Sequence, residues 1–102
     1  MVTQVKTGTV TGTGAAINVA VGFSPSVIHI FNKTDPGFYV WTKDMDDAAM
    51  VKLTDAPALT APTSNGVTPY AGAIAATSEG FTIGADTDMN AASDVLYWVA
   101  WS

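Results

Sequence analysis

Apolar and polar residues alternate along most of this chain, and almost no segment has the 3.6-residue period of an amphipathic helix. The opening segment, residues 3–13, carries threonine at every odd position except Val5, while the even positions hold glutamine, lysine, glycine and valine. Successive side chains of a strand point to opposite faces of a sheet. The pattern therefore predicts a strand with one face formed by threonine side chains, which is solvated or only lightly covered.

Five further segments have the composition of strands, since they are rich in valine, isoleucine and aromatic residues and are bounded by turn-forming residues. They are residues 17–21, 27–32, 38–43, 80–84 and 94–101. The turn composition NKTDPG predicts that residues 27–43 form a hairpin. Residues 44–53 stay ambiguous, because Asp44 or Asp46 suits the cap of one helical turn and residues 50–53 suit a short strand.

The last of these segments is apolar on both of its faces. Val95, Tyr97, Val99 and Trp101 fall on one face, whereas leucine, tryptophan and alanine fall on the other. A strand of this kind is expected to lie centrally in a sheet, between two covered faces. An alternative is that the final aromatic residues pack at a subunit interface, where tryptophan and tyrosine are enriched.

The segment 54–77 is rich in alanine, threonine and proline and has one charged residue, Asp55. It is predicted to be a long loop, and loops of this length in a compact domain tend to serve an interaction. The chain as a whole contains about seven predicted strands separated by frequent turn signals. We therefore expect residues 1–102 to form a single all-β domain, either a compact antiparallel β-sandwich (jelly-roll-like) or a small barrel.

Composition and charge narrow the classes of function. The chain has 102 residues, no cysteine and a net charge of -5, so disulfides and cysteine-based zinc sites are excluded. The negative charge argues against binding to nucleic acid or to an anionic membrane surface. No apolar run reaches the roughly 18 residues of a membrane-spanning helix. The first residues also lack the apolar stretch of a signal peptide, so we expect a complete cytosolic product.

Three groups of polar residues are candidates for chemistry, and none of them amounts to an active site. Asp86, Asp88 and Asn90 alternate as in the first half of a calcium loop, but the turning glycine and the bidentate glutamate are missing. His29 is the only histidine and lies in an apolar strand, so it is expected to be a packed or edge residue. The aspartates of residues 44–47 have the composition of a solvated turn. We expect no enzymatic activity, no cofactor and no metal site.

Two blocks of sequence contain a distinctive order of strand and turn motifs. Residues 11–45 have a Gly-Phe-x-Pro step into a strand that ends in asparagine, followed by an aromatic hairpin partner. Residues 80–101 have a Gly-Phe-Thr-Ile-Gly run, then aspartate and asparagine, before a final aromatic strand. The motif residues are Gly22, Phe23, Pro25, Val27, Asn32, Gly80, Phe81, Thr82, Gly84, Asp86, Asn90, Tyr97 and Trp98. This order resembles small structural proteins of tailed-phage virions, over a little more than half of the chain.

The resemblance implies a capsid decoration (cement) protein or a domain of a tail or fibre protein. A decoration protein would bind the major capsid protein and sister copies of itself, as a homo-trimer or dimer, on the capsid exterior of a virion. Such proteins are made in the cytoplasm of the host bacterium. The alternative is a tail or fibre tip that binds a host receptor or a glycan, with Tyr39 or Trp41 exposed for stacking on sugar.

The surface that would make these contacts is predicted from the threonine face and from the segment 54–77. That segment has too few apolar side chains for a second core and almost no charge to keep it apart from another protein. Its prolines also limit the conformational entropy that is lost on docking. The candidate interface residues are Thr3, Thr7, Thr9, Pro57, Pro62, Pro69, Tyr70 and Trp101.

Overall fold

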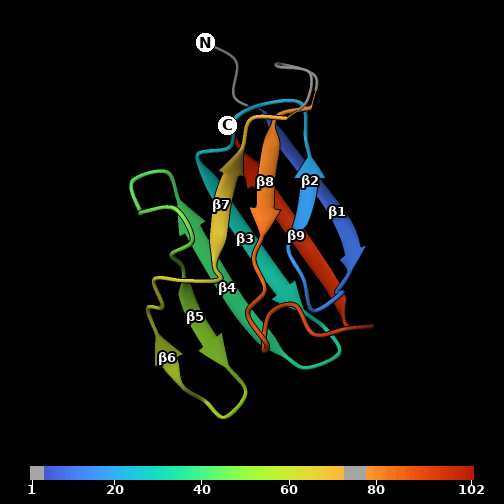
Figure 1. The fold of residues 1–102 in the computed structure, drawn as a ribbon, viewed down its shortest axis with the longest axis vertical. Coiled ribbons are helices and arrows are strands. Elements are labelled where there is room, and N and C mark those ends of the chain that lie inside the picture. Colours follow the sequence, from blue (N-terminus) through green and yellow to red (C-terminus); the bar gives the residue numbers. More distant parts are fainter. Residues whose placement is uncertain (1–3, 73–77) are drawn as a thin grey trace.

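The computed structural model describes residues 4–72 and 78–102, and this part of the chain contains strands and turns but no helix. Figure 1 shows the path of the chain through the strands. The strands are β1 (Val5–Thr11), β2 (Ile17–Ala20), β3 (Val27–Asn32), β4 (Gly37–Thr42), β5 (Val51–Thr54), β6 (Leu59–Thr60), β7 (Val67–Tyr70), β8 (Gly80–Ile83) and β9 (Val95–Trp101).

The strands form two antiparallel sheets that pack against each other as a small β-sandwich (Figure 1). The larger sheet has the strand order β1-β9-β3-β4-β5-β6, and the smaller has the order β2-β8-β7. The smaller sheet lies over one side of the larger sheet, while β5 and β6 extend past it. The expected antiparallel sandwich is therefore confirmed, whereas these strands do not close into the barrel that was its alternative.

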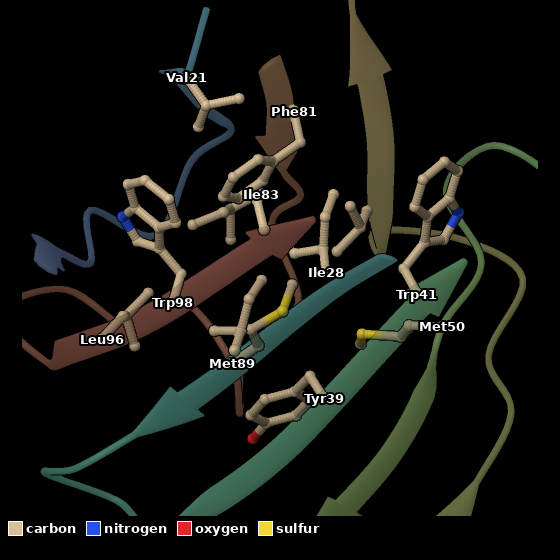
Figure 2. Packing of buried hydrophobic residues seen from close by; sticks show 13 residues of the cluster. Val21, Ile28, Tyr39, Trp41, Met50, Phe81, Ile83, Met89, Leu96 and Trp98 are labelled. Carbon is tan, nitrogen blue, oxygen red and sulfur yellow. The ribbon is translucent and has the colours of Figure 1, made fainter. Parts of the chain in front are cut away.

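Large side chains from both sheets fill the space between them (Figure 2). Phe81 of the smaller sheet meets Trp98 of the larger one edge to face, with ring centroids 5.4 Å apart. Both rings are buried, as the sequence predicts for apolar strands near the end of the chain. The other buried members of this cluster are Val21, Ile28, Ile30, Tyr39, Trp41, Met50, Val67, Ile83, Met89, Leu96 and Ala100.

Gly8 shows which side of β1 faces the core. Gly8 lies opposite Trp98 in the register of β1 and β9, and a Cβ atom at Gly8 would come within 2.5 Å of the Trp98 indole. The absence of a side chain at Gly8 therefore leaves room for the ring. Since the even positions of β1 face inward, its threonines at odd positions face outward.

Two expectations about the middle of the chain are wrong. The segment 54–77 was expected to be one long loop, but its described part, residues 54–72, contains β6 and β7, and residues 4–72 and 78–102 form nine strands where about seven were expected. β7 pairs with β8 and completes the smaller sheet. Pro69 argued against a strand at this point of the sequence, because proline is largely confined to edge strands. β7 is such an edge strand.

The ambiguous residues 44–53 contain a turn and the start of β5. The turn is held by the Met45 N–H, which donates to the Thr42 carbonyl, and by the Ala49 N–H, which donates to the Asp46 carbonyl. Met50 follows the turn as a fully buried residue. Of the two possibilities, the short strand is the one that forms.

Candidate interaction surface

The larger sheet has one side packed against the smaller sheet and one side turned away from it. In each strand every second side chain points to the outward side, and the strand register shows which side chains these are. We call this surface the outer face. It consists of Val5, Thr7, Thr9, Thr11, Val27, His29, Phe31, Phe38, Val40, Thr42, Val51, Leu53, Leu59, Val95, Tyr97, Val99 and Trp101.

The register aligns apolar side chains of the outer face in rows across the sheet. One row crosses all six strands, and a second row lies beside it. In the first row Phe31 and Phe38 stack with ring centroids 4.7 Å apart. The first row is Thr9, Tyr97, Phe31, Phe38, Leu53 and Leu59, and the second is Thr7, Val99, His29, Val40 and Val51.

His29 sits in the second row between two aromatic rings. Phe38 and Trp101 make T-shaped contacts with it, at centroid distances of 5.3 Å and 4.9 Å. The expectation that this histidine is a packed residue is confirmed. Its neighbours show that the outer face is an organised aromatic surface, with ring contacts of its own.

All large hydrophobic side chains that are exposed in residues 4–72 and 78–102 lie on the outer face. They are Val5 (60% exposed), Phe31 (42%), Val51 (37%), Leu53 (40%), Leu59 (71%) and Tyr97 (42%). With about 150–250 Å² for a large apolar side chain, these fractions correspond to on the order of 500 Å². Single exposed hydrophobic residues are ordinary, and a patch of about 300–600 Å² is the largest that a typical monomer exposes and is often functional.

In β5 the apolar residues point outward and the charged residue points inward. Val51 and Leu53 point outward and are exposed, whereas Lys52 between them points inward and has only 15% of its side chain exposed. A strand of an isolated sandwich is expected to have the opposite arrangement, because lysine is rarely buried without a partner. The outward residues of β5 therefore suit a second contact surface better than they suit water.

The outer face contains no aspartate, glutamate or lysine. Carboxylates lie instead in the turns at both ends of the strands, in the β4–β5 turn at one end and, at the other, in the β3–β4 turn, the β5–β6 turn and the β8–β9 loop. There, repulsion from Asp55 is the largest effect that raises the pKa of Asp35, followed by slight burial and by Asp94 and Asp88. The negative charge of the protein is thus separated from its apolar surface.

Some of the predicted interface residues lie on the outer face, and the others lie elsewhere. Thr7 and Thr9 are exposed on the outer face, and Trp101 lies there half-buried. Pro57 is exposed in the β5–β6 turn, and half-buried Pro62 accepts a backbone hydrogen bond from Met50 at 3.3 Å. The structure therefore brings together three of the seven candidate residues that it describes.

The remaining candidate residues lie away from the outer face or outside the described chain. Pro69 and Tyr70 belong to β7 of the smaller sheet. Thr3 lies outside the described residues. The glycan-stacking residues of the alternative, Tyr39 and Trp41, are both only 1% exposed and form part of the core, so the expectation that they are exposed is wrong.

Sequence reasoning missed the main residues of the outer face. The sequence predicts a central position for β9, which is right, because β9 lies between β1 and β3. It also predicts cover on both faces, which is wrong within the described chain, since Tyr97 is 42% exposed. The available signal was that 27–32 and 94–101 are apolar at both odd and even positions, although one sandwich core covers only one set.

Asp86 and Asp88 bind a lysine of the same chain. The Lys52 ammonium group lies 2.8 Å from an Asp86 carboxylate oxygen and 2.7 Å from one of Asp88. Burial alone would raise the pKa of Asp86, but hydrogen bonds from Lys52 and from the Met89 and Asp88 amides lower it. For Lys52, burial acts to lower the pKa, yet the two carboxylates raise it. This ion group joins β5 to the β8–β9 loop.

Two buried asparagines hold the same loop. The Asn32 amide donates to the Asp94 carboxylate at 2.8 Å and to the carbonyls of Asp88 and Met89. Asn90 donates to the carbonyls of Ala15 and Gly84 and accepts from the Thr13 N–H. The polar motif residues at the ends of the strands therefore have structural partners.

Comparison of the chain with protein-family models, with curated proteins and with solved structures gives no match. In the part of the chain that the structure describes, no helix is suited to crossing a membrane. The same residues contain no group of three or more side chains of the metal-binding types. The outer face is thus the feature of the described chain with the clearest chemical character for binding.

Proposed function

We propose that this protein is a non-catalytic structural component of a tailed-phage virion, and specifically a homo-oligomeric capsid decoration protein. It binds the assembled shell from outside and stabilises it by adding contacts between neighbouring capsid subunits. The proposal is supported by the two sequence blocks, 11–45 and 80–101, that resemble such proteins.

One observation carries the proposal: the exposed large hydrophobic side chains of the described residues gather on one uncharged face. A protein that works alone in water gains nothing from such a surface, whereas a protein that assembles uses it to bury area. Association of identical copies also multiplies weak contacts with a symmetric shell, so the assembly binds more tightly than each copy does.

The contact with the shell is assigned to residues that lie away from the outer face. Pro57 and Pro69 are exposed, and Tyr70 is half-buried beside Pro69. Proline loses little conformational freedom on docking, and tyrosine provides large contact area with a polar tip. These three residues are therefore the proposed shell-binding group.

The test uses shells assembled without this protein. Purified protein is added, and co-sedimentation and the heat resistance of the shells are measured. We expect saturable binding and greater heat resistance for the natural chain, and weaker binding by about tenfold or more for Pro69→Asp, since a buried unpaired charge is unfavourable. Ala92→Asp, at an exposed residue of the β8–β9 loop whose neighbour Ser93 donates to the Gly12 carbonyl beside β1, is the matched control.

Failure to bind shells would overturn the proposal. If the protein instead bound host cells or glycans in a saturable manner, the tail or fibre tip would become the better assignment.

A further inference from the structure

We propose that the outer face binds a second copy of this chain, so that two six-stranded sheets stack face to face in a two-fold symmetric dimer. The inference concerns self-association in solution, and it stands whether or not the protein binds a capsid.

The first argument is the area that such an interface needs. The six exposed side chains provide on the order of 500 Å², and half-buried Trp101, Phe38, Val40 and Val99 extend the same surface. A standard interface buries about 800 Å² on each partner. The outer face is therefore of the size that a stable dimer covers, and its ring pair, Phe31 with Phe38, lies between β3 and β4 at the middle of the sheet, where interface residues contribute most.

The second argument is that the outer face is complementary to itself. A two-fold interface brings the same patch together from both copies. Charged groups in such a patch would face the same charges on the second copy. This repulsion would be strong for a chain with a net charge of -5. The outer face has no charged aspartate, glutamate or lysine, and sheets with apolar side chains stack at a spacing of about 10 Å.

The sizes of the side chains in the two apolar rows select the direction of the axis. Charge does not, because aspartates lie at both ends of the strands, in the β3–β4 and β5–β6 turns at one end and in the β4–β5 turn at the other. An axis that runs across the strands, between the two rows, stacks each strand on its own copy, so that Phe38 faces Val40 of the second copy and Leu53 faces Val51. Large side chains then meet smaller ones, as close packing requires.

Sedimentation velocity over about 1 to 200 µM tests the dimer, a range that detects micromolar dissociation constants. The natural chain, of 10.5 kDa per copy, is expected to sediment as a dimer. Phe31→Asp is expected to raise the dissociation constant at least about 100-fold, because symmetry buries the new charge twice. Leu59→Asp, at a residue that is 71% exposed, tests the same face with little risk to folding. Asn18→Asp adds the same charge on the smaller sheet and should leave the dimer intact.

The axis is tested with a spin label, because the chain has no cysteine and Thr9→Cys introduces a single labelling site. A label on β1 should give a distance below about 25 Å across the dimer, since β1 then stacks on its own copy at a sheet spacing of about 10 Å. An Ala20→Cys label on the smaller sheet should give more than about 30 Å, because four layers separate the two labels.

The outcomes either support the inference or overturn it. A monomer at every concentration, or an oligomer that survives both Phe31→Asp and Leu59→Asp, would overturn it. Dissociation by Asn18→Asp alone would place the interface on the other sheet. A dimer with a long Thr9 distance would overturn the axis across the strands.

Discussion

The two sheets of this sandwich present different surfaces to the outside, although both are built by the same alternation. The outward side of the smaller sheet carries Asn18, Ala20, Thr68, Tyr70 and Thr82, and the Thr82 hydroxyl donates to the Asn18 side chain at 2.7 Å. The outer face of the larger sheet carries stacked aromatic rings and exposed leucine and valine. Since the same solvent would meet both surfaces, the contrast indicates that the outward side of the smaller sheet is adapted to water except at half-buried Tyr70, whereas the outer face is apolar along its length.

The largest expected effect is a difference in unfolding free energy between substitutions on the two sides of β9. Trp98 is 6% exposed and packs on Phe81, whereas neighbouring Tyr97 is 42% exposed on the outer face. Trp98→Ala should lower the free energy of unfolding by about 3–5 kcal/mol, because it leaves a cavity in the core. Tyr97→Ala should cost about 1 kcal/mol or less in the monomer. Urea denaturation at low protein concentration measures both, and equal losses would contradict the division into a core side and an interaction side.

A smaller effect is expected where β5 has lysine inside and aliphatic residues outside. Lys52→Met removes the partner of Asp86, whose side chain is only 11% exposed. The loss should be about 1–3 kcal/mol of unfolding free energy, because a desolvated carboxylate is left without its cation. The outer face is untouched, so dimer dissociation measured by sedimentation should not change. A variant with native stability would show that Lys52 is inward for some other reason.

How much of this arrangement the sequence predicts depends on what each strand must pack against. The hairpin of β3 and β4 and the strands β8 and β9 are predicted to within one or two residues, because strong alternation and turn residues define them. β6 has two residues and β7 contains Pro69, so neither has enough local pattern.

The candidate surface was harder to predict. Alternation groups Phe31 with His29 and Tyr97 with Val99 within their own strands, but it does not show which face of the sheet a second layer covers. That depends on the smaller sheet, which is assembled from strands far apart in the sequence.

The next expected effect concerns pH and the ion group of Lys52, Asp86 and Asp88. The pKa of Asp86 is lowered in the folded protein, so its ion group stabilises the fold above the ordinary aspartate pKa of about 4. This stability is lost as the pH falls through the lowered pKa. The raised pKa of Lys52 stabilises the fold below about pH 10, and that contribution is lost as the pH rises through the folded value. Urea midpoints should fall at both limits, and Lys52→Met should remove most of this dependence. A midpoint of the natural chain that stays constant from pH 3 to 5 would count against the ion group.

The smallest expected effect is a heat of calcium binding near zero. Lys52 already occupies the position between the Asp86 and Asp88 carboxylates, and the glutamate of a calcium loop is missing. Titration calorimetry should detect no micromolar affinity. Micromolar binding that Asp86→Ala abolishes would show that the acidic loop, as well as the outer face, is a binding site.

The central claim is that the outer face, and not the outward side of the smaller sheet, is covered by a second copy. Threonine methyl groups allow a matched measurement, because Thr7 and Thr9 lie on the outer face while Thr68 and Thr82 lie on the smaller sheet. Methyl NMR spectra recorded from about 10 µM to 1 mM span the association expected for such an interface. The account predicts concentration-dependent shifts for Thr7 and Thr9 and constant shifts for Thr68 and Thr82. Shifts confined to Thr68 and Thr82, or no concentration dependence in a monomeric protein, would contradict it.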